Sequence, residues 1–301
     1  MSINNVSVNV GTKEITFETG KLALQAPGSV VVKSGNTTVL VTAVANKEVR
    51  DGIDFFPLTV DVEERMYAAG KIPGGFFRRE GRQTEKAILS SRLIDRPLRP
   101  SFDDGFRCET QIIATVLSVD TEIDYDILAL NAASTALQLG GIPLQQPVAG
   151  VRMSLIEGNW VAQASTSEQE NSTFDMVVAG NLNKNNDIDI VMVEAGATDN
   201  AFIFIDEGGL APTEEIVANG IDESKQYIAA IINAQKELVA KCDVPNIEWP
   251  TIEDYSSEVK EKIENFLKDK LENVFDNTDK ASRADAENAL KEEVLAEFLN
   301  E

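Results

Sequence analysis

The chain has 301 residues, and its 43% hydrophobic content suffices for a large core in one large or two ordinary domains. Its 27 Lys and Arg residues stand against 50 Asp and Glu, a net charge of -23 that excludes a general affinity for polyanions. The sequence has no histidine, which excludes Ser-His-Asp and Cys-His catalysis within the chain.

The start of the chain has neither a basic segment nor an apolar one, and no later run approaches the roughly 18 apolar residues of a membrane span. We therefore expect a cytoplasmic protein without membrane contact. The cysteines Cys108 and Cys242 are too few and too far apart in the sequence for a metal site. They are predicted to be buried thiols.

An alternating, β-branched pattern predicts that a β-sheet opens the protein, with a turn at residues 34–36. The strands are expected near residues 15–17, 29–32, 38–44 and 56–62.

The next segment, from Gly70 to Gly81, contains four glycines and a proline, so it is expected to form a loop. Thr84 can cap a helix that runs to about Asp95, before Pro97 stops it.

Further strands and one apolar helix are predicted downstream, giving mixed sheet and helix in the first two-thirds. We expect a buried strand over 110–119, a helix from Asp126 to Gly140, and two hairpins that turn at 157–159 and 181–186.

After about Leu210 the apolar residues recur at helical spacing. Thr213 can cap a first long helix, a second is expected over Val259 to Phe275, and a third carries Leu290 to Phe298. These apolar stripes are interpreted as packing faces in an acidic helical module.

Eight of the eleven arginines lie between residues 65 and 107, in a chain that is otherwise acidic. Arginine rather than lysine favours planar, bidentate recognition of phosphate or carboxylate. The segment therefore predicts a local, salt-sensitive anion-binding site. Its arginines are Arg65, Arg78, Arg79, Arg82, Arg92, Arg96, Arg99 and Arg107.

The loop around residues 74–82 places two aromatic side chains next to cations. Phe76 or Phe77 can stack on an unpaired base while Arg78 and Arg79 neutralise neighbouring phosphates, and stacking contributes about 1 to 3 kcal/mol per base. The alternative is a structural loop whose phenylalanines pack into a partner chain.

Arg92, Arg96 and Arg99 follow at intervals of four and three, so the first two share a helix face and the third lies close beyond it. Together with Arg82 they are predicted to form a platform for single-stranded RNA. The alternative is that Asp95 orients Arg96 or Arg99 in a structural ion pair.

Four segments closely resemble the polynucleotide phosphorylase family: Phe76 to Arg82, Ser91 to Pro100, Ile113 to Asp120 and Asn131 to Leu137. The resemblance implies an α+β fold in which residues 1–208 form a first RNase PH-like domain, similar to a ribosomal protein fold. It also implies that residues 209–301 form an all-α linker domain.

The resemblance further implies a homotrimeric ring in which the Phe-Phe-Arg-Arg loops constrict a channel and guide RNA 3′ ends. Phosphorolysis of RNA to nucleoside diphosphates, with inorganic phosphate and Mg²⁺, would belong to a second RNase PH-like half after residue 301. We therefore expect no catalytic and no metal-binding residue in this chain, and no activity from it alone.

Internal homology implies that the phosphate-binding serines of the active half correspond to the segment Asp124–Tyr125–Asp126, whose carboxylates would repel phosphate. Asp175 keeps a metal-binding aspartate, but Val177 replaces the lysine. The family's Gly-His-Glu is replaced by Asn219 to Glu223, which removes the histidine.

Two alternatives remain open from the sequence. One is a self-sufficient RNase PH-like exonuclease, which the acidic segment and Val177 disfavour. The other is a non-enzymatic RNA-binding or scaffold protein, which applies if the natural chain ends at residue 301.

Overall fold

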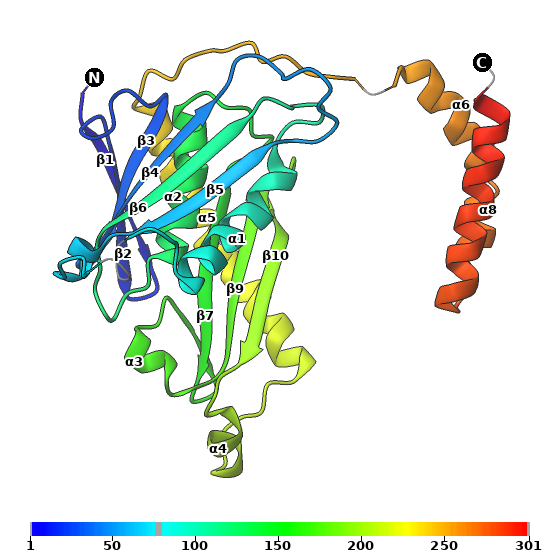
Figure 1. Cartoon of the computed structure of the whole chain (residues 1–301). Helices are drawn as coiled ribbons and strands as arrows, with labels where there is room; N and C mark the ends of the chain where they lie inside the picture. The colour runs from blue at the N-terminus through cyan, green and yellow to red at the C-terminus, as the bar shows by residue number, and fades with distance from the viewer. Residues whose placement is uncertain (1, 76–79, 254, 300–301) are drawn as a thin grey trace. The chain divides into compact units, whose positions relative to one another are not determined.

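The computed structural model describes residues 2–75, 80–253 and 255–299, and these form two compact units divided between Thr251 and Ile252 (Figure 1). The first unit combines two β-sheets with helices, and the second contains helices alone. The predicted α+β class followed by an all-α part is confirmed.

A six-stranded sheet lies at the start of the first unit, as the alternating pattern predicts. All neighbours in it are antiparallel except β5 and β6, which are parallel. The predicted strands are confirmed, while β1 was not predicted. In spatial order the strands are β1 (Asn4–Val10), β2 (Lys13–Thr19), β3 (Gly28–Ser34), β4 (Thr37–Ala45), β6 (Thr110–Ser118) and β5 (Leu58–Glu64).

A second, four-stranded antiparallel sheet contains the two predicted hairpins. Its strands, in spatial order, are β10 (Ile188–Ala197), β9 (Ser172–Leu182), β7 (Val148–Ile156) and β8 (Asn159–Ala162). Two short helices flank this sheet and were not predicted, namely α3 (Thr166–Gln169) and α4 (Ala201–Asp206).

Helix α2 (Asp126–Leu139) is the centre of the first unit, since it contacts β3 and β4 of one sheet and β7 of the other. Every residue of the helix except Gln138 is buried, which explains why its sequence is apolar all round. Its Asn131 donates to the carbonyl of Gly150 at 3.0 Å and accepts from the Gly150 amide at 2.8 Å. This reciprocal pair ties α2 to β7.

Helix α1 (Glu85–Leu98) begins as predicted, because the Thr84 hydroxyl accepts a hydrogen bond from the Ala87 amide at 3.1 Å. The prediction that Pro97 stops the helix is wrong, since Pro97 and Leu98 are inside it. A proline in the last turn removes one hydrogen bond, and Leu98 is fully buried there. Burial of the final turn therefore offsets the missing bond.

Helix α5 (Glu214–Ala240) is capped by Thr213 as predicted, but it packs within the first unit against α2, β1, β7 and β9. Its Gln235 is fully buried and donates to the Val148 carbonyl at 3.0 Å. The change from mixed to helical structure thus follows β10, while the division between the two compact units lies after Thr251. The domain boundary at residue 208 stays a prediction.

In the second unit, two helices stand where the sequence predicts one over Val259 to Phe275, namely α6 (Ser257–Leu267) and α7 (Leu271–Phe275). They are followed by α8 (Lys280–Phe298). The rings of Phe266 and Phe298 meet edge to face at 5.6 Å between centroids. Among the described residues, no helix has the length and hydropathy needed to cross a membrane.

Both cysteines are free thiols. Cys108 is fully buried, and burial raises the pKa of its thiol. Cys242 is half-buried, so the prediction of a buried thiol holds fully only for Cys108.

Candidate nucleic-acid interface and the pocket beside it

Three of the predicted arginines gather along one side of α1. Arg92, Arg96 and Arg99 line a groove of about 430 Å³ between this helix and strand β5. All three are exposed, and the prediction that Arg92 and Arg96 share a face is confirmed. We call this feature the α1–β5 groove.

The three arginines differ in what they contact. Arg99 forms a bidentate ion pair with Asp95, with N–O distances of 3.0 and 2.6 Å. It also donates hydrogen bonds to the carbonyls of Phe56 and Leu58, at 3.0 and 3.1 Å. The structural ion pair left open by the sequence therefore exists for Arg99. The guanidinium also lies over the Phe56 ring, 5.9 Å from its centroid.

Arg96 forms an ion pair with Glu194 at 2.7 Å, in which about half of each side chain is exposed. Exposed pairs of this kind contribute little and exchange partners readily. Within the described parts of the chain, Arg92 forms no hydrogen bond or ion pair. Arg92 is thus the member of the set with its guanidinium available to an anion.

The structure shows less about the other residues predicted to bind RNA. Arg82 is exposed, and no described residue bonds to it. Phe76, Phe77, Arg78 and Arg79 lie outside the described residues. Their assignment to RNA stays a prediction.

Two further arginines of the cluster form contacts within the chain. Arg65 forms ion pairs with Glu63 and Glu80, and Arg107 donates to the Ile53 carbonyl at 3.3 Å.

A second pocket, of about 740 Å³, lies beyond α1 where that helix approaches α2, β7, β9 and the end of β10. Three of the residues singled out by internal homology line it, namely Asp126, Asp175 and Val177. Lys86 of α1 and Arg152 of β7 are the cations of the lining, which also contains Glu85, Glu194 and Asp199. We call it the α2–β9 pocket.

Arg152 joins the two aspartates of this pocket. Its guanidinium bonds to Asp126 and to Asp175, each at 2.5 Å, and Ser154 donates to Asp175 at 2.7 Å. Burial disfavours the charged form of Arg152, but the fields of the two carboxylates outweigh it and raise its pKa. The three side chains form one ionised, largely buried cluster.

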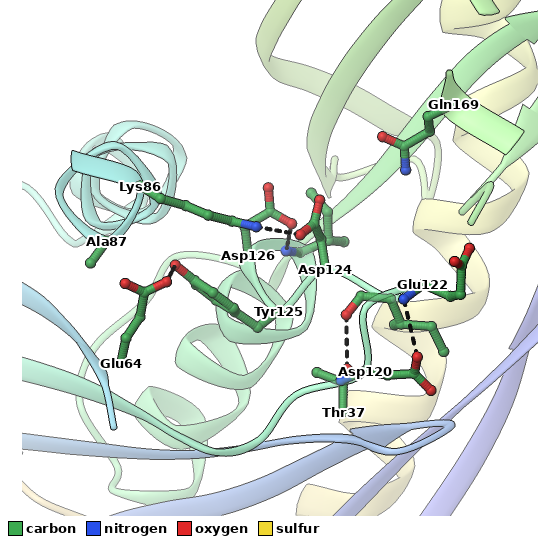
Figure 2. A network of polar contacts seen from close by, with 12 residues as sticks. Thr37, Glu64, Lys86, Ala87, Asp120, Glu122, Asp124, Tyr125, Asp126 and Gln169 are labelled. Atoms are coloured by element: carbon green, nitrogen blue, oxygen red, sulfur yellow. Dashed lines mark hydrogen bonds and ion pairs between the residues drawn. The ribbon is translucent and has the colours of Figure 1, made fainter. Parts of the chain in front are cut away.

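A neighbouring set of contacts holds the start of α2 (Figure 2). Lys86 reaches from α1 to Asp124 at 2.5 Å, and the Tyr125 hydroxyl donates to Glu64 at 2.7 Å. Burial, together with that hydrogen bond, raises the pKa of the Tyr125 hydroxyl. Tyr125 is therefore a neutral donor at physiological pH.

These contacts refine the sequence argument about phosphate. The carboxylates of Asp124, Asp126 and Asp175 each form an ion pair, the first with Lys86 and the other two with Arg152, so each has an internal partner. Lys86, Arg152 and Ser154 were missed from the sequence. Arg152 did give a signal, as the single charge in a strand, residues 148–156, whose only other polar residue is Ser154.

The pocket does not fit a divalent cation. Asp126 and Asp175 each bond to Arg152, so an ion bound between them would displace a guanidinium that is already paired. Val177, which is 4% exposed, supplies no ligand and no charge. Elsewhere in the described residues, no group of three or more acidic or cysteine side chains is arranged to hold a metal.

Comparison with known proteins agrees with this architecture. Residues 11–143 match the model of the 3′ exoribonuclease family, domain 1. The solved structure of rice Rrp46 superimposes with a TM-score of 0.55 at 14% sequence identity, covering 79% of this chain and 94% of that one, which is a likeness of fold.

The sequence relatives are more similar. The chain is 49% identical over 288 residues to a polyribonucleotide nucleotidyltransferase of Renibacterium salmoninarum, covering 95% of this chain and 38% of that protein. It is 52% identical over 259 residues to the Acidothermus cellulolyticus protein of the same name, covering 86% and 33%. The chain thus spans well under half the length of these relatives.

The match over residues 11–143 identifies this segment as a first RNase PH-like domain of the 3′ exoribonuclease family. Over most of its length, the chain is similar to a part of the polyribonucleotide nucleotidyltransferases that carry this domain.

Proposed function

We propose that this chain is the RNA-guiding part of a 3′-to-5′ phosphorolytic exoribonuclease whose chemistry takes place in another part of the protein. The observation that supports this most directly is the α1–β5 groove, where Arg92 and Arg96 are exposed on the surface of a strongly acidic chain. Single-stranded RNA is the polyanion that the names of the relatives imply.

The α2–β9 pocket supports the second half of the proposal, namely that the chain alone is inactive. Phosphorolysis requires an inorganic phosphate held against the terminal phosphodiester and a group that stabilises the developing charge. In this pocket Lys86 and Arg152 are engaged by carboxylates. Neither cation is available to phosphate unless an ion pair is first broken.

The same proposal extends to the whole protein. We place it in the cytoplasm, as a homotrimer that degrades mRNA, with Mg²⁺ and inorganic phosphate bound by a second RNase PH-like half. The Phe76–Arg79 loop would then contact the RNA that the ring admits.

The first test is an activity assay. We expect the purified chain, incubated with RNA, phosphate and Mg²⁺, to release no nucleoside diphosphate, while a longer protein that includes the second half does so. Diphosphate release by the 301-residue chain would show a complete active site within it and would overturn the assignment of catalysis elsewhere.

The second test is RNA binding at two ionic strengths. A local arginine cluster working against a net charge of -23 predicts weak binding that falls steeply as salt is added. Changing Phe76 and Phe77 to alanine is expected to weaken binding with little effect on the salt slope, whereas Arg78→Ala with Arg79→Ala lowers both. Salt-independent binding would contradict the electrostatic account.

A further inference from the structure

Strand β5 lies at the edge of the six-stranded sheet, so only one side of it is paired with another strand. The carbonyl of Pro57 accepts a hydrogen bond from the Thr110 amide of β6 at 3.0 Å. With the parallel register that pairs Leu58 with Thr110 and Val60 with Ile112, residues 57, 59, 61 and 63 bond to β6. The backbone groups of Leu58, Val60 and Val62 therefore face the open edge.

On either side of Val60, the outward backbone groups of the edge strand already have hydrogen-bond partners. The Val62 amide donates to the Ser91 hydroxyl at 3.1 Å, and its carbonyl accepts from Gln83 at 3.2 Å. The Leu58 carbonyl accepts from Arg99 at 3.1 Å, while the Leu58 amide donates to the Phe56 carbonyl. Both positions are thus closed to a ligand.

Val60 is different. Across the described parts of the chain, no side chain bonds to its outward amide or carbonyl. The residue lines the α1–β5 groove together with Arg92 and Arg96, and its side chain packs on the core. One residue of the edge therefore offers an adjacent donor and acceptor, in a groove where the Arg92 guanidinium also has no partner among the described residues.

An adjacent N–H donor and C=O acceptor complement one edge of a nucleobase. The Watson–Crick edge of every RNA base presents a neighbouring acceptor and donor, so this contact holds any base that is not already paired. The groove, at about 430 Å³, is within the size range of small-ligand sites. Arg92 is placed to bind the phosphate of the same nucleotide or its neighbour.

We propose that the α1–β5 groove binds one unpaired nucleotide of single-stranded RNA, with the Val60 backbone contacting the base edge and Arg92 and Arg96 contacting phosphate. The inference rests on the proposed function and specifies where and how RNA is held. An added peptide strand fits less well, because strand addition needs several open backbone positions in a row and only Val60 is open here.

The direct test observes the Val60 amide by NMR in the full chain labelled with ¹⁵N-valine, with its signal assigned through the variant Val60→Ile. We expect saturable shifts of this signal with AMP, with UMP and with an unstructured oligoribonucleotide. Ribose 5-phosphate, which has the phosphate but no base, is expected to leave it unchanged.

A charge variant tests the phosphate contact. Arg92→Gln is expected to reduce the salt slope of oligoribonucleotide binding by about 0.7, the value for loss of one phosphate contact on a single strand. Arg283→Gln is the matched control, because it makes the same charge change on the exposed surface of α8 and is expected to leave the slope unchanged.

Removal of the donor provides an independent variant. Val60→Pro deletes an amide that faces the open edge, where proline is tolerated, and replaces a side chain that packs on the core. It is expected to abolish the contact with the base and to weaken oligoribonucleotide binding. Should this variant fail to fold, the amide shifts of the unmodified chain decide the matter alone.

The outcomes separate this inference from the proposed function. RNA binding with an unmoved Val60 signal and an unaffected Arg92→Gln slope would overturn the groove assignment and leave RNA guidance standing. No RNA binding at all would overturn both. A Val60 shift produced by a poly-glutamate peptide but not by nucleotides would identify a peptide surface instead and overturn the proposal.

Discussion

The α1–β5 groove and the α2–β9 pocket lie on either side of α1, and they differ in whether their arginines are paired with carboxylates. In the pocket, Arg152 is largely buried and bonds to two carboxylates, whereas Arg92 in the groove is exposed without a partner in the described residues. Buried charges must be paired because desolvation is costly, while exposed charges need no partner.

The difference teaches that a cation in a pocket is not by itself a sign of ligand binding. In the larger pocket both cations are engaged by carboxylates, Arg152 by Asp126 and Asp175 and Lys86 by Asp124. The smaller groove has the available charge. Four predictions, three for substitutions and one for pH, can break or sharpen this contrast.

The largest effect is expected from Arg152→Met. This change leaves the carboxylates of Asp126 and Asp175, whose side chains are 11% and 23% exposed, without their counter-charge. Loss of one partner of a buried ionic cluster lowers the free energy of unfolding by about 3 to 5 kcal/mol. Urea denaturation of the variant and of the parent chain measures this difference in the free energy of unfolding.

The control for this variant combines Arg152→Met with Asp126→Asn and Asp175→Asn. Removing all the charges together is expected to recover much of the lost stability, because no uncompensated carboxylate remains. A single variant as stable as the parent would mean that the cluster is well solvated and that the contrast with the groove is false.

Arg99→Gln is expected to be the next most damaging change, with a loss of about 1.5 kcal/mol in the free energy of unfolding. Arg99 bonds to Asp95 and to two backbone carbonyls, but its side chain is 43% exposed, so solvent reduces the value of each bond. Arg92→Gln is the matched control and should leave stability unchanged. Equal losses in the two variants would contradict the division of roles along α1.

Thr84→Ala tests the positioning of α1, the helix that separates the two sites. The hydroxyl of Thr84 caps the Ala87 amide, and loss of such a cap costs about 1 kcal/mol. Thr84→Ser keeps the oxygen and should retain most of the stability in thermal unfolding. If serine proved as harmful as alanine, the hydroxyl would not be the stabilising group.

The smallest effect is a pH dependence at Glu122, close to the start of α2. Its carboxylate accepts hydrogen bonds from the hydroxyl and amide of Ser167, at 2.6 and 3.1 Å, and these hold its pKa below the ordinary value of 4.5. Its stabilising contribution is therefore present above pH 4.5 and is lost as the pH falls through the lowered value.

An NMR titration of the Glu122 carboxyl group measures that pKa directly. Ser167→Ala removes the hydroxyl donor and is expected to move the pKa back toward 4.5. A Glu122 that titrates at the ordinary value in the parent chain would show that the contact with Ser167 is not maintained in solution.

Much of the fold could be predicted because local pattern and final structure agree. Alternation predicted β2 to β5, and Thr84 and Thr213 marked the starts of α1 and α5. Pro97 misled because burial of the last turn of α1 outweighs one missing hydrogen bond. Burial is a tertiary effect, and local sequence does not reveal it.

The candidate sites were predictable only in part, for the same physical reason. The spacing of Arg92 and Arg96 fixes a shared helix face, but it cannot tell which arginine finds a partner. Glu194 is far from Arg96 in sequence, and Arg152 meets Asp126 and Asp175 only when β7, α2 and β9 come together. The open backbone of Val60 is likewise a product of sheet order.

The way α1 covers β5 also bears on self-association. An exposed edge strand is a template on which another chain can add its own strand, and this leads to aggregation or domain swapping. Here Ser91, Gln83 and Arg99 occupy the outward hydrogen-bonding groups on both sides of Val60, leaving too short a stretch for a foreign strand to nucleate. Ser91 and Arg99, which also line the groove, thus act with Gln83 to keep the edge of the sheet from pairing with another chain.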